Sequence, residues 1–344
     1  MVDFIDAEIH SLAIHMVGNK IQEEPLQLSE ALPDLDEDIL ELLKKFFTKG
    51  FKNAQLQKLS HHIDVEKNPI LQQVKSIFDN PDNLLSASQD LARELYETSE
   101  HPNIKAGEFY TVYFEHCYFK DEVTTAIGLF KSENKEIFLK VFPENESYGV
   151  TQDQGIRINR LDKGCIIVNT HAEDGYRVLV TDNTNPNQEA QFWKDKFLHL
   201  KPVADVYYHT ANYMQMCRDF AMESFPAAPK SDKLALMNES AEYFKEEPAF
   251  DKVSFQEKVL KEPEIIEAFE TYKDDYVQRK EIEIVDEFDV SAPAVKNMKK
   301  VFKSVIKLDK NFHVYVHGSR DRIVKGYDEE SGMHYYQLYF QEES

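Results

Sequence analysis

Apolar and polar residues alternate with a period of two over much of the stretch from Gly107 to Asp182. The stretch divides at short polar breaks into the segments FYTVYFEHCYF, VTTAIGLFKS, EIFLKVF, GIRINR, GCIIVNT and YRVLVTD, which are rich in β-branched and aromatic residues. Two of the breaks, LDKG and the Asp-Gly pair of HAEDGY, are typical of turns. Parallel neighbours need long crossovers, so these short links predict consecutive antiparallel strands in a meander.

Helical periodicity flanks the strands on both sides. We predict a first strand from Asp3 to Val17, and then helices over Leu35–Phe47, Pro69–Phe78, Asp82–Thr98, Val203–Phe225, Lys230–Lys245, Lys252–Leu260 and Pro263–Val277. The expected fold is therefore α+β, an antiparallel β-meander core flanked by an N-terminal helical segment and a C-terminal helical segment ending in a helix-hairpin unit. The corresponding regions are 1–104 (mainly helical with an initial strand), 105–200 (sheet), 201–290 (acidic helices) and 291–344 (basic helix plus β-hairpin).

Charge is distributed unevenly along the chain. The 344 residues carry a net charge of −22, and Lys201 to Asp289 has 21 acidic and 11 basic residues, a net charge of −10. The stretch from Ala294 to Lys325 has nine basic and two acidic residues, a net charge of +7. The acidic total disfavours nonspecific contact with nucleic acid, whereas a local basic surface could still bind a polyanion.

The basic stretch predicts an amphipathic helix followed by a hairpin. Ser291 can cap a helix from Ala294 to Lys307, in which Val295, Met298 and Phe302 fall on one arc and the lysines on another. NFHVYVHG and HYYQLYF are predicted strands joined by the basic loop GSRDR. Such cations would hold a phosphate backbone without reading bases. The candidate DNA-binding residues are Lys296, Lys299, Lys300, Lys303, Lys307, Arg320, Arg322 and Lys325.

Motifs for catalysis or cofactor binding are missing from the sequence. Cys117, Cys165 and Cys217 form no CxxC pair, and the histidines lack zinc-site spacing, so we expect buried thiols in a reducing cytoplasm and no metal. Neither GxSxG nor GxxxxGK[ST] occurs, so we expect no catalytic residue and no cofactor. The amino terminus lacks a secretory signal pattern and no apolar run is long enough for a membrane span. Strand aromatics, Tyr110, Tyr113, Phe119, Tyr335 and Tyr339, are expected to be core residues rather than base-stacking platforms.

Four segments are informative when taken together: AIGLFKSENKEIFLKV, GIRINRLDKGCIIVNT, QFWKDKFLHLKP and the terminal NFHVYVHGSRDRIVKGYDEESGMHYYQLYF. In these segments the chain resembles the bacterial nucleoid-associated proteins of the NdpA type. The resemblance implies a cytoplasmic protein of the bacterial nucleoid that binds double-stranded DNA, directly or indirectly, and contacts DNA-handling enzymes such as a topoisomerase. It supplies no catalytic or DNA-contacting residue, so the candidate residues above rest on charge and spacing.

Two hypotheses follow. In the first, the protein is non-enzymatic and binds duplex DNA through phosphate contacts with little sequence preference, and a homodimer would let two basic regions act together. In the second, the acidic helices dock a DNA-processing enzyme and the association with DNA is indirect. For both charged regions the structural alternative is a solvated surface, in which the lysines only offset the acidic remainder of the chain.

Overall fold

The structure is a computed structural model that describes residues 2–51, 55–120, 122–184, 192–226, 228–299, 302, 305–308, 311–315 and 323–342. The chain forms two compact units, Met1–Val203 and Ala204–Ser344. The division into four regions, which is finer than this, remains a prediction. Each unit is described by itself below.

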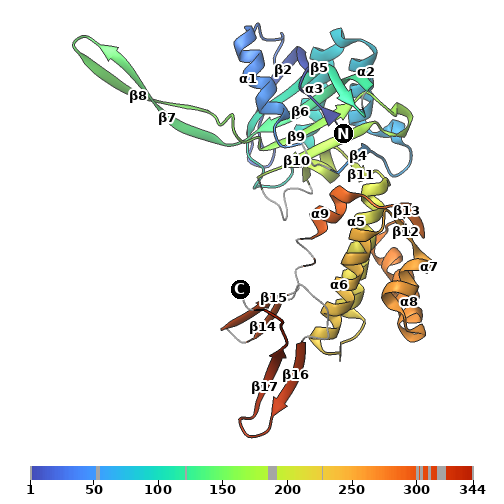
Figure 1. Ribbon diagram of the computed structural model, residues 1–344. Coiled ribbons are helices and arrows are strands. Elements are labelled where there is room, and N and C mark those ends of the chain that lie inside the picture. Colours follow the sequence, from blue (N-terminus) through green and yellow to red (C-terminus); the bar gives the residue numbers. More distant parts are fainter. Residues whose placement is uncertain are drawn as a thin grey trace. The chain divides into compact units, whose positions relative to one another are not determined.

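The first unit is built on an antiparallel sheet with the strand order β11-β4-β10-β9-β6-β5-β2-β3, and β1 also pairs with β5 (Figure 1). The strands are β1 (Val2–Asp3), β2 (Glu8–Val17), β3 (Leu26–Gln27), β4 (Gln57–Leu59), β5 (Gly107–Phe119), β6 (Glu122–Ser132), β9 (Lys163–Val168), β10 (Arg177–Asp182) and β11 (Leu200–Pro202). The described strand pairings are all antiparallel and the chain also contains many helices, which confirms the predicted α+β class.

One hairpin departs from the predicted meander. Among the described strands, β7 (Lys135–Glu144) and β8 (Ser147–Ile156) pair only with each other, and β6 pairs directly with β9. The strand predicted at GIRINR was wrong over most of its length, because β8 ends at Ile156. The central strands β6 and β9 are buried along most or all of their length, whereas both faces of β7 are exposed. Alternation alone could not distinguish these two environments.

Helices cover both faces of this sheet. They and the shorter turns are α1 (Glu37–Thr48), η1 (Val65–Lys67), α2 (Pro69–Asp79), η2 (Pro81–Asn83), α3 (Leu84–Thr98), η3 (Ala172–Asp174) and the π-helical turn η4 (Phe192–Phe197). The three N-terminal helices were predicted within about two residues of these bounds. Asp36 caps α1 by accepting from the Ile39 N–H, and Asn68 caps α2 by accepting from the Ile70 and Leu71 N–H groups.

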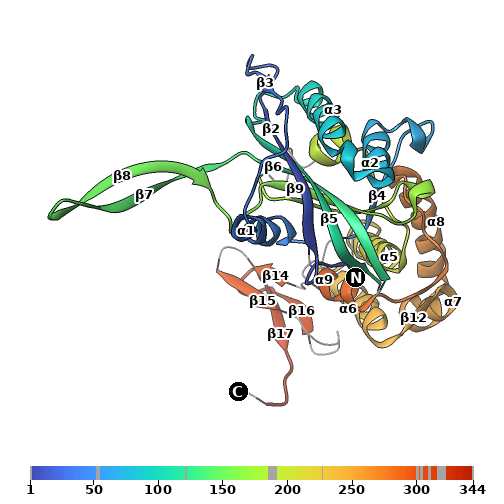
Figure 2. The same cartoon turned by 90° about the horizontal axis from the view of Figure 1, so that it is seen from above.

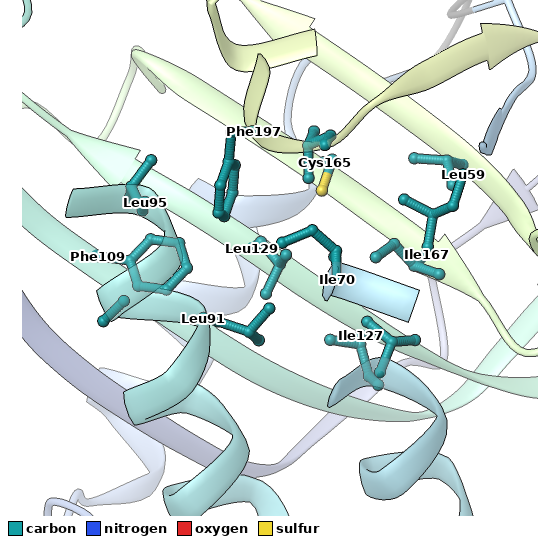
Figure 3. Close-up of a cluster of buried hydrophobic side chains, with 14 of the residues drawn as sticks. Leu59, Ile70, Leu91, Leu95, Phe109, Ile127, Leu129, Cys165, Ile167 and Phe197 are labelled. Atoms are coloured by element: carbon teal, nitrogen blue, oxygen red, sulfur yellow. The ribbon is translucent and has the colours of Figure 1, made fainter. Parts of the chain in front are cut away.

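The two faces of the sheet carry separate hydrophobic clusters. On one face α2, α3 and η4 pack Ile70, Leu91 and Phe197 onto strand residues such as Ile127 and Ile167 (Figure 3). On the other face Phe46 and Phe47 of α1 pack with Tyr110, Phe130 and Ile166. Because successive strand residues point to opposite faces, both faces require apolar residues, which explains the continuous apolar runs of β6 and β9.

The second unit is mainly helical. Its elements are α5 (Val206–Glu223), α6 (Lys230–Glu246), β12 (Ala249–Asp251), α7 (Lys252–Phe255), the π-helical turn η5 (Gln256–Leu260), α8 (Pro263–Lys280), β13 (Glu287–Asp289), α9 (Ala292–Met298), β14 (Val305–Leu308), β15 (Phe312–Tyr315), β16 (Ile323–Asp328) and β17 (Met333–Leu338). Tyr213 lies in the core of this unit, and its ring centroid is 4.0–6.2 Å from those of Phe244, Phe250, Phe255, Phe269 and Phe288.

Candidate nucleic-acid interface

The basic stretch begins on the short helix α9. Ser291 caps it by accepting from the Ala294 N–H at 3.4 Å, and the next turns bury Ala294 and Val295 in the core of the second unit. The Asn297 side-chain amide donates to the Tyr207 hydroxyl of α5 at 2.9 Å, which ties α9 to α5. Lys296 is consequently held on the exposed side of the helix.

The predicted helix from Ala294 to Lys307 was wrong in its second half. Helix α9 ends at Met298, and Val305–Leu308 form strand β14, which pairs antiparallel with β15. The β-branched residues Val305 and Ile306 favour a strand once Val314 and Tyr315 are available as cross-strand neighbours. Lys307 therefore lies on a strand and does not share a helical ridge with Lys296.

The structure places only part of the candidate set. Lys296 lies on α9, Lys299 is the C-cap residue that follows it, and Lys325 lies on β16, all three exposed. Lys307 lies on β14 opposite His313. Lys300, Lys303, Arg320 and Arg322 lie outside the described residues. Lys296 and Lys299 are thus brought together by α9, and no described contact connects either of them with Lys325.

Pairing with acidic groups separates these lysines from seven other cations of the same unit. Lys261 lies 2.8 Å from Glu239, Lys258 lies 2.5 Å from Glu247, and further ion pairs join Arg218, Lys245, Lys252, Lys273 and Arg279 to neighbouring carboxylates. Within the described part of the chain, no carboxylate forms an ion pair with Lys296, Lys299 or Lys325. Their ammonium groups are thus not engaged by described acidic residues and remain available to phosphate.

The expectation that Tyr335 and Tyr339, near the β16–β17 hairpin, are core residues was wrong. Tyr335 is 48% exposed and Tyr339 is 52% exposed, so neither is a core residue, whereas Tyr110, Tyr113 and Phe119 are buried as predicted. Tyr335 lies over Gly326 of the paired strand, because a Cβ at Gly326 would fall 2.2 Å from the Tyr335 ring. Pairing with a glycine leaves the outer side of this tyrosine ring uncovered.

Helix α8 carries a group of exposed acidic residues. Glu264, Glu267, Asp274 and Asp275 are exposed and fall within an arc of about 100° on the helix. None of the four forms an ion pair with another described residue. The four residues form what we call the α8 acidic stripe, a surface that a basic partner could contact.

A comparison with protein-family models shows the family to which the chain belongs. Residues 13–333 match the model of the family described as nucleoid-associated protein YejK. The chain belongs to this family. The predicted resemblance is thus confirmed, and the match extends over both compact units. A comparison with curated proteins gives no match.

Two of the segments that carry the family resemblance meet in a buried ionic cluster that sequence reasoning missed. Lys131 Nζ lies 3.1 Å from Glu133 Oε1, and Lys163 Nζ lies 2.9 Å from Glu133 Oε2. Asp162 Oδ2 accepts from the Glu133 N–H at 2.7 Å and the Asn134 N–H at 2.9 Å. Burial lowers the pKa of Lys131, opposed by the charge and hydrogen bond of Glu133. The cluster fixes the place where the β7–β8 hairpin leaves the sheet.

Two further findings concern metal binding and membrane-spanning helices. In the ranges described above, no group of three or more His, Cys, Asp or Glu residues is arranged to hold a metal ion. No helix in those ranges is both long and apolar enough to cross a membrane. The three cysteines are free and buried, as expected for core side chains.

Proposed function

We propose that this member of the nucleoid-associated family binds duplex DNA directly, without catalytic activity, through phosphate contacts made by the basic C-terminal stretch. The family places the protein at the nucleoid. The observation that supports a direct contact is the exposure of Lys296, Lys299 and Lys325 without a described acidic partner, in a unit where seven other cations form ion pairs. The corresponding compartment is the cytoplasm, as expected for a protein of the nucleoid.

Lysine ammonium groups act on phosphate as point charges and carry little base information. The proposed binding therefore has little sequence preference and weakens steeply as salt concentration rises. The acidic remainder of the chain repels DNA elsewhere and leaves the basic stretch as the contact region.

A gel-shift titration of the purified protein against two unrelated duplexes of equal length, across a series of salt concentrations, tests the proposal. We expect a shift at low salt with similar affinity for both duplexes and a linear fall of log K with log salt. Absence of any shift at low salt would contradict direct binding.

The α8 acidic stripe supports a second candidate function. In this alternative the stripe docks a basic surface of a DNA-processing enzyme such as a topoisomerase, and DNA is reached through that partner. Replacing Glu264, Glu267, Asp274 and Asp275 by their amides would then abolish the association with the enzyme. Under direct binding the same replacement leaves DNA retention intact or strengthens it, because it removes negative charge.

A further inference from the structure

The β7–β8 hairpin extends away from the sheet of the first unit (Figures 1 and 2). Its register runs without interruption from the Lys135–Ile156 pair to the Glu144–Ser147 pair. Apart from Gly149, residues 135–154 are exposed. An isolated two-stranded hairpin is at best marginally stable in water, so a partner that covered an arm of this length would stabilise it. We call this hairpin the arm.

One face of the arm is covered by its own side chains. Phe142 lies over Gly149 and Phe138 over Gly155, since a Cβ at either glycine would fall 2.5 and 3.0 Å from the respective ring. On the same face Lys140 Nζ lies 3.0 Å from Asp153 Oδ2. Aromatic rings across glycines and a cross-strand ion pair are arrangements that stabilise a two-stranded ribbon facing solvent.

The opposite face is apolar and uncharged. Ile137, Leu139, Val141, Tyr148 and Val150 are each 63–72% exposed. Their neighbours across the strands on this face are one another, Pro143, Gln152 and Gln154, so no charged residue interrupts the face beyond the Lys135–Ile156 pair. We call these residues the uncharged face of the arm. Contiguous exposed apolar surface of this kind marks an interaction site.

We propose that the uncharged face binds the same face of a second copy of this chain and that the arm is the dimerisation element of the protein. Most soluble oligomers are symmetric dimers in which one patch contacts its own copy. Each chain carries a net charge of −22, so association of two copies requires a contact surface that brings no like charges together. The uncharged face meets this requirement, and Gln152 and Gln154 can hydrogen-bond across a two-fold axis.

The size of the face is sufficient for such a contact. At about 100 Å² for each exposed apolar side chain, two copies would bury about 1,000 Å², the area at which specific interfaces begin. Duplex DNA is a poor alternative occupant. The arm has more acidic than basic residues, with Glu144 and Glu146 at its tip, which repels phosphate.

Paired charge variants test the proposal on the full chain. The double variant Leu139→Glu, Val150→Glu places carboxylates on the uncharged face, and the control Ser147→Glu, Thr151→Glu places the same charges on the opposite face of the same hairpin. We expect size-exclusion chromatography with light scattering at micromolar concentration to give dimers for the wild type and the control, and monomers for the first variant. A monomeric wild type, or a dimeric first variant, would overturn the proposal.

Mixing provides a second, independent readout. Chains with Leu139→Lys and Val150→Lys are expected to be monomeric alone and to form a one-to-one dimer with the Leu139→Glu, Val150→Glu chains, because opposite charges then meet across the interface. Absence of mixed dimers would contradict face-to-face pairing and would favour a different protein as the occupant.

An arm-deleted chain is a control for the case in which the charge variants misfold. Lys131 and Lys163 are paired residues of neighbouring strands, so the sheet closes below the arm and residues 136–155 can be replaced by a short turn. This chain is expected to be folded and monomeric. A folded dimer without the arm would also overturn the proposal.

Discussion

The Nζ atom of Lys163 lies 2.9 Å from Oε2 of Glu133, and both side chains are about 2% exposed. The second oxygen of the same carboxylate lies 3.1 Å from Nζ of Lys131, so one buried Glu serves two ammonium groups. Lys131 and Lys163 are cross-strand neighbours in β6 and β9. The cluster therefore joins the two strands at the point where the chain departs into the arm and returns from it.

Removal of Glu133 should strongly destabilise the first unit. Glu133→Ala leaves two buried ammonium groups without a countercharge, and we expect a loss of about 3–5 kcal/mol in the free energy of unfolding, measured by urea titration with circular dichroism. Asp153→Ala breaks the exposed Lys140–Asp153 pair and serves as the control, for which we expect no significant change. Equal losses in the two variants would show that the buried cluster has no special role.

The pH dependence of stability should report on His15. Its Nδ1 accepts from the Ser29 N–H at 3.0 Å, and its Nε2 lies 2.9 Å from Ser88 Oγ, whose hydroxyl donates to the Leu85 carbonyl. These partners require a neutral ring protonated at Nε2. Desolvation by burial, reinforced by the charge of Arg93, lowers the pKa of His15 from 6.5 to about 4.

Between pH 6.5 and about 4, His15 binds a proton more tightly in the unfolded chain than in the folded one. The free energy of unfolding therefore falls as pH falls through this window. We expect His15 to account for about 3 kcal/mol of that loss, from about 1.4 kcal/mol for each pH unit. Urea titrations at a series of pH values check this, and His15→Gln should flatten the decline. A decline as steep in the variant as in the wild type would assign it to other groups.

Gly175 should tolerate no side chain. It has φ +81° and its carbonyl accepts from the Leu59 N–H at 2.8 Å, and an added Cβ would lie 2.0 Å from the Leu59 carbonyl oxygen. Gly175→Ala would push β4 away from the turn before β10. Gly50 has φ +107° with no neighbouring atom within 4 Å, so Gly50→Ala should cost only the left-handed backbone penalty of about 1–2 kcal/mol. Thermal unfolding should show a clearly larger loss for Gly175→Ala than for Gly50→Ala.

Neutralising the lysines without a described acidic partner should weaken DNA binding and its salt dependence. We expect the triple variant Lys296→Gln, Lys299→Gln, Lys325→Gln to make the slope of log K against log salt shallower by about 2 to 3 units. Lys245→Gln, Lys258→Gln, Lys261→Gln changes the net charge equally but removes lysines that are paired with Glu242, Glu247 and Glu239. An identical slope change in both triple variants would mean that total charge, not position, controls binding.

Local patterns predicted local conformation well. Segments rich in β-branched and aromatic residues identified β5, β6, β9 and β10, and helical spacing with capping residues identified α1 to α3 and the long helices of the second unit. The predictions that failed concern features that depend on residues of a neighbouring strand. The end of α9 at Met298 depends on strand β15, and the exposure of Tyr335 depends on the glycine opposite it. Of the candidate site, Lys296, Lys299 and Lys325 are exposed, whereas the predicted placement of Lys307 on the same helix as Lys296 was wrong.

The sequence by itself determined the α+β class, the antiparallel links, the membership in a nucleoid-associated family and the local sign of charge, because backbone propensity, link length and residue type are properties of short segments. Only the tertiary structure decided that β6 pairs with β9, that β7 and β8 leave the sheet as an arm, and that Lys131 and Lys163 are buried on Glu133. Burial and pairing are set by residues far apart in the chain. A lysine or a valine therefore has the same local pattern whether the fold covers it or exposes it.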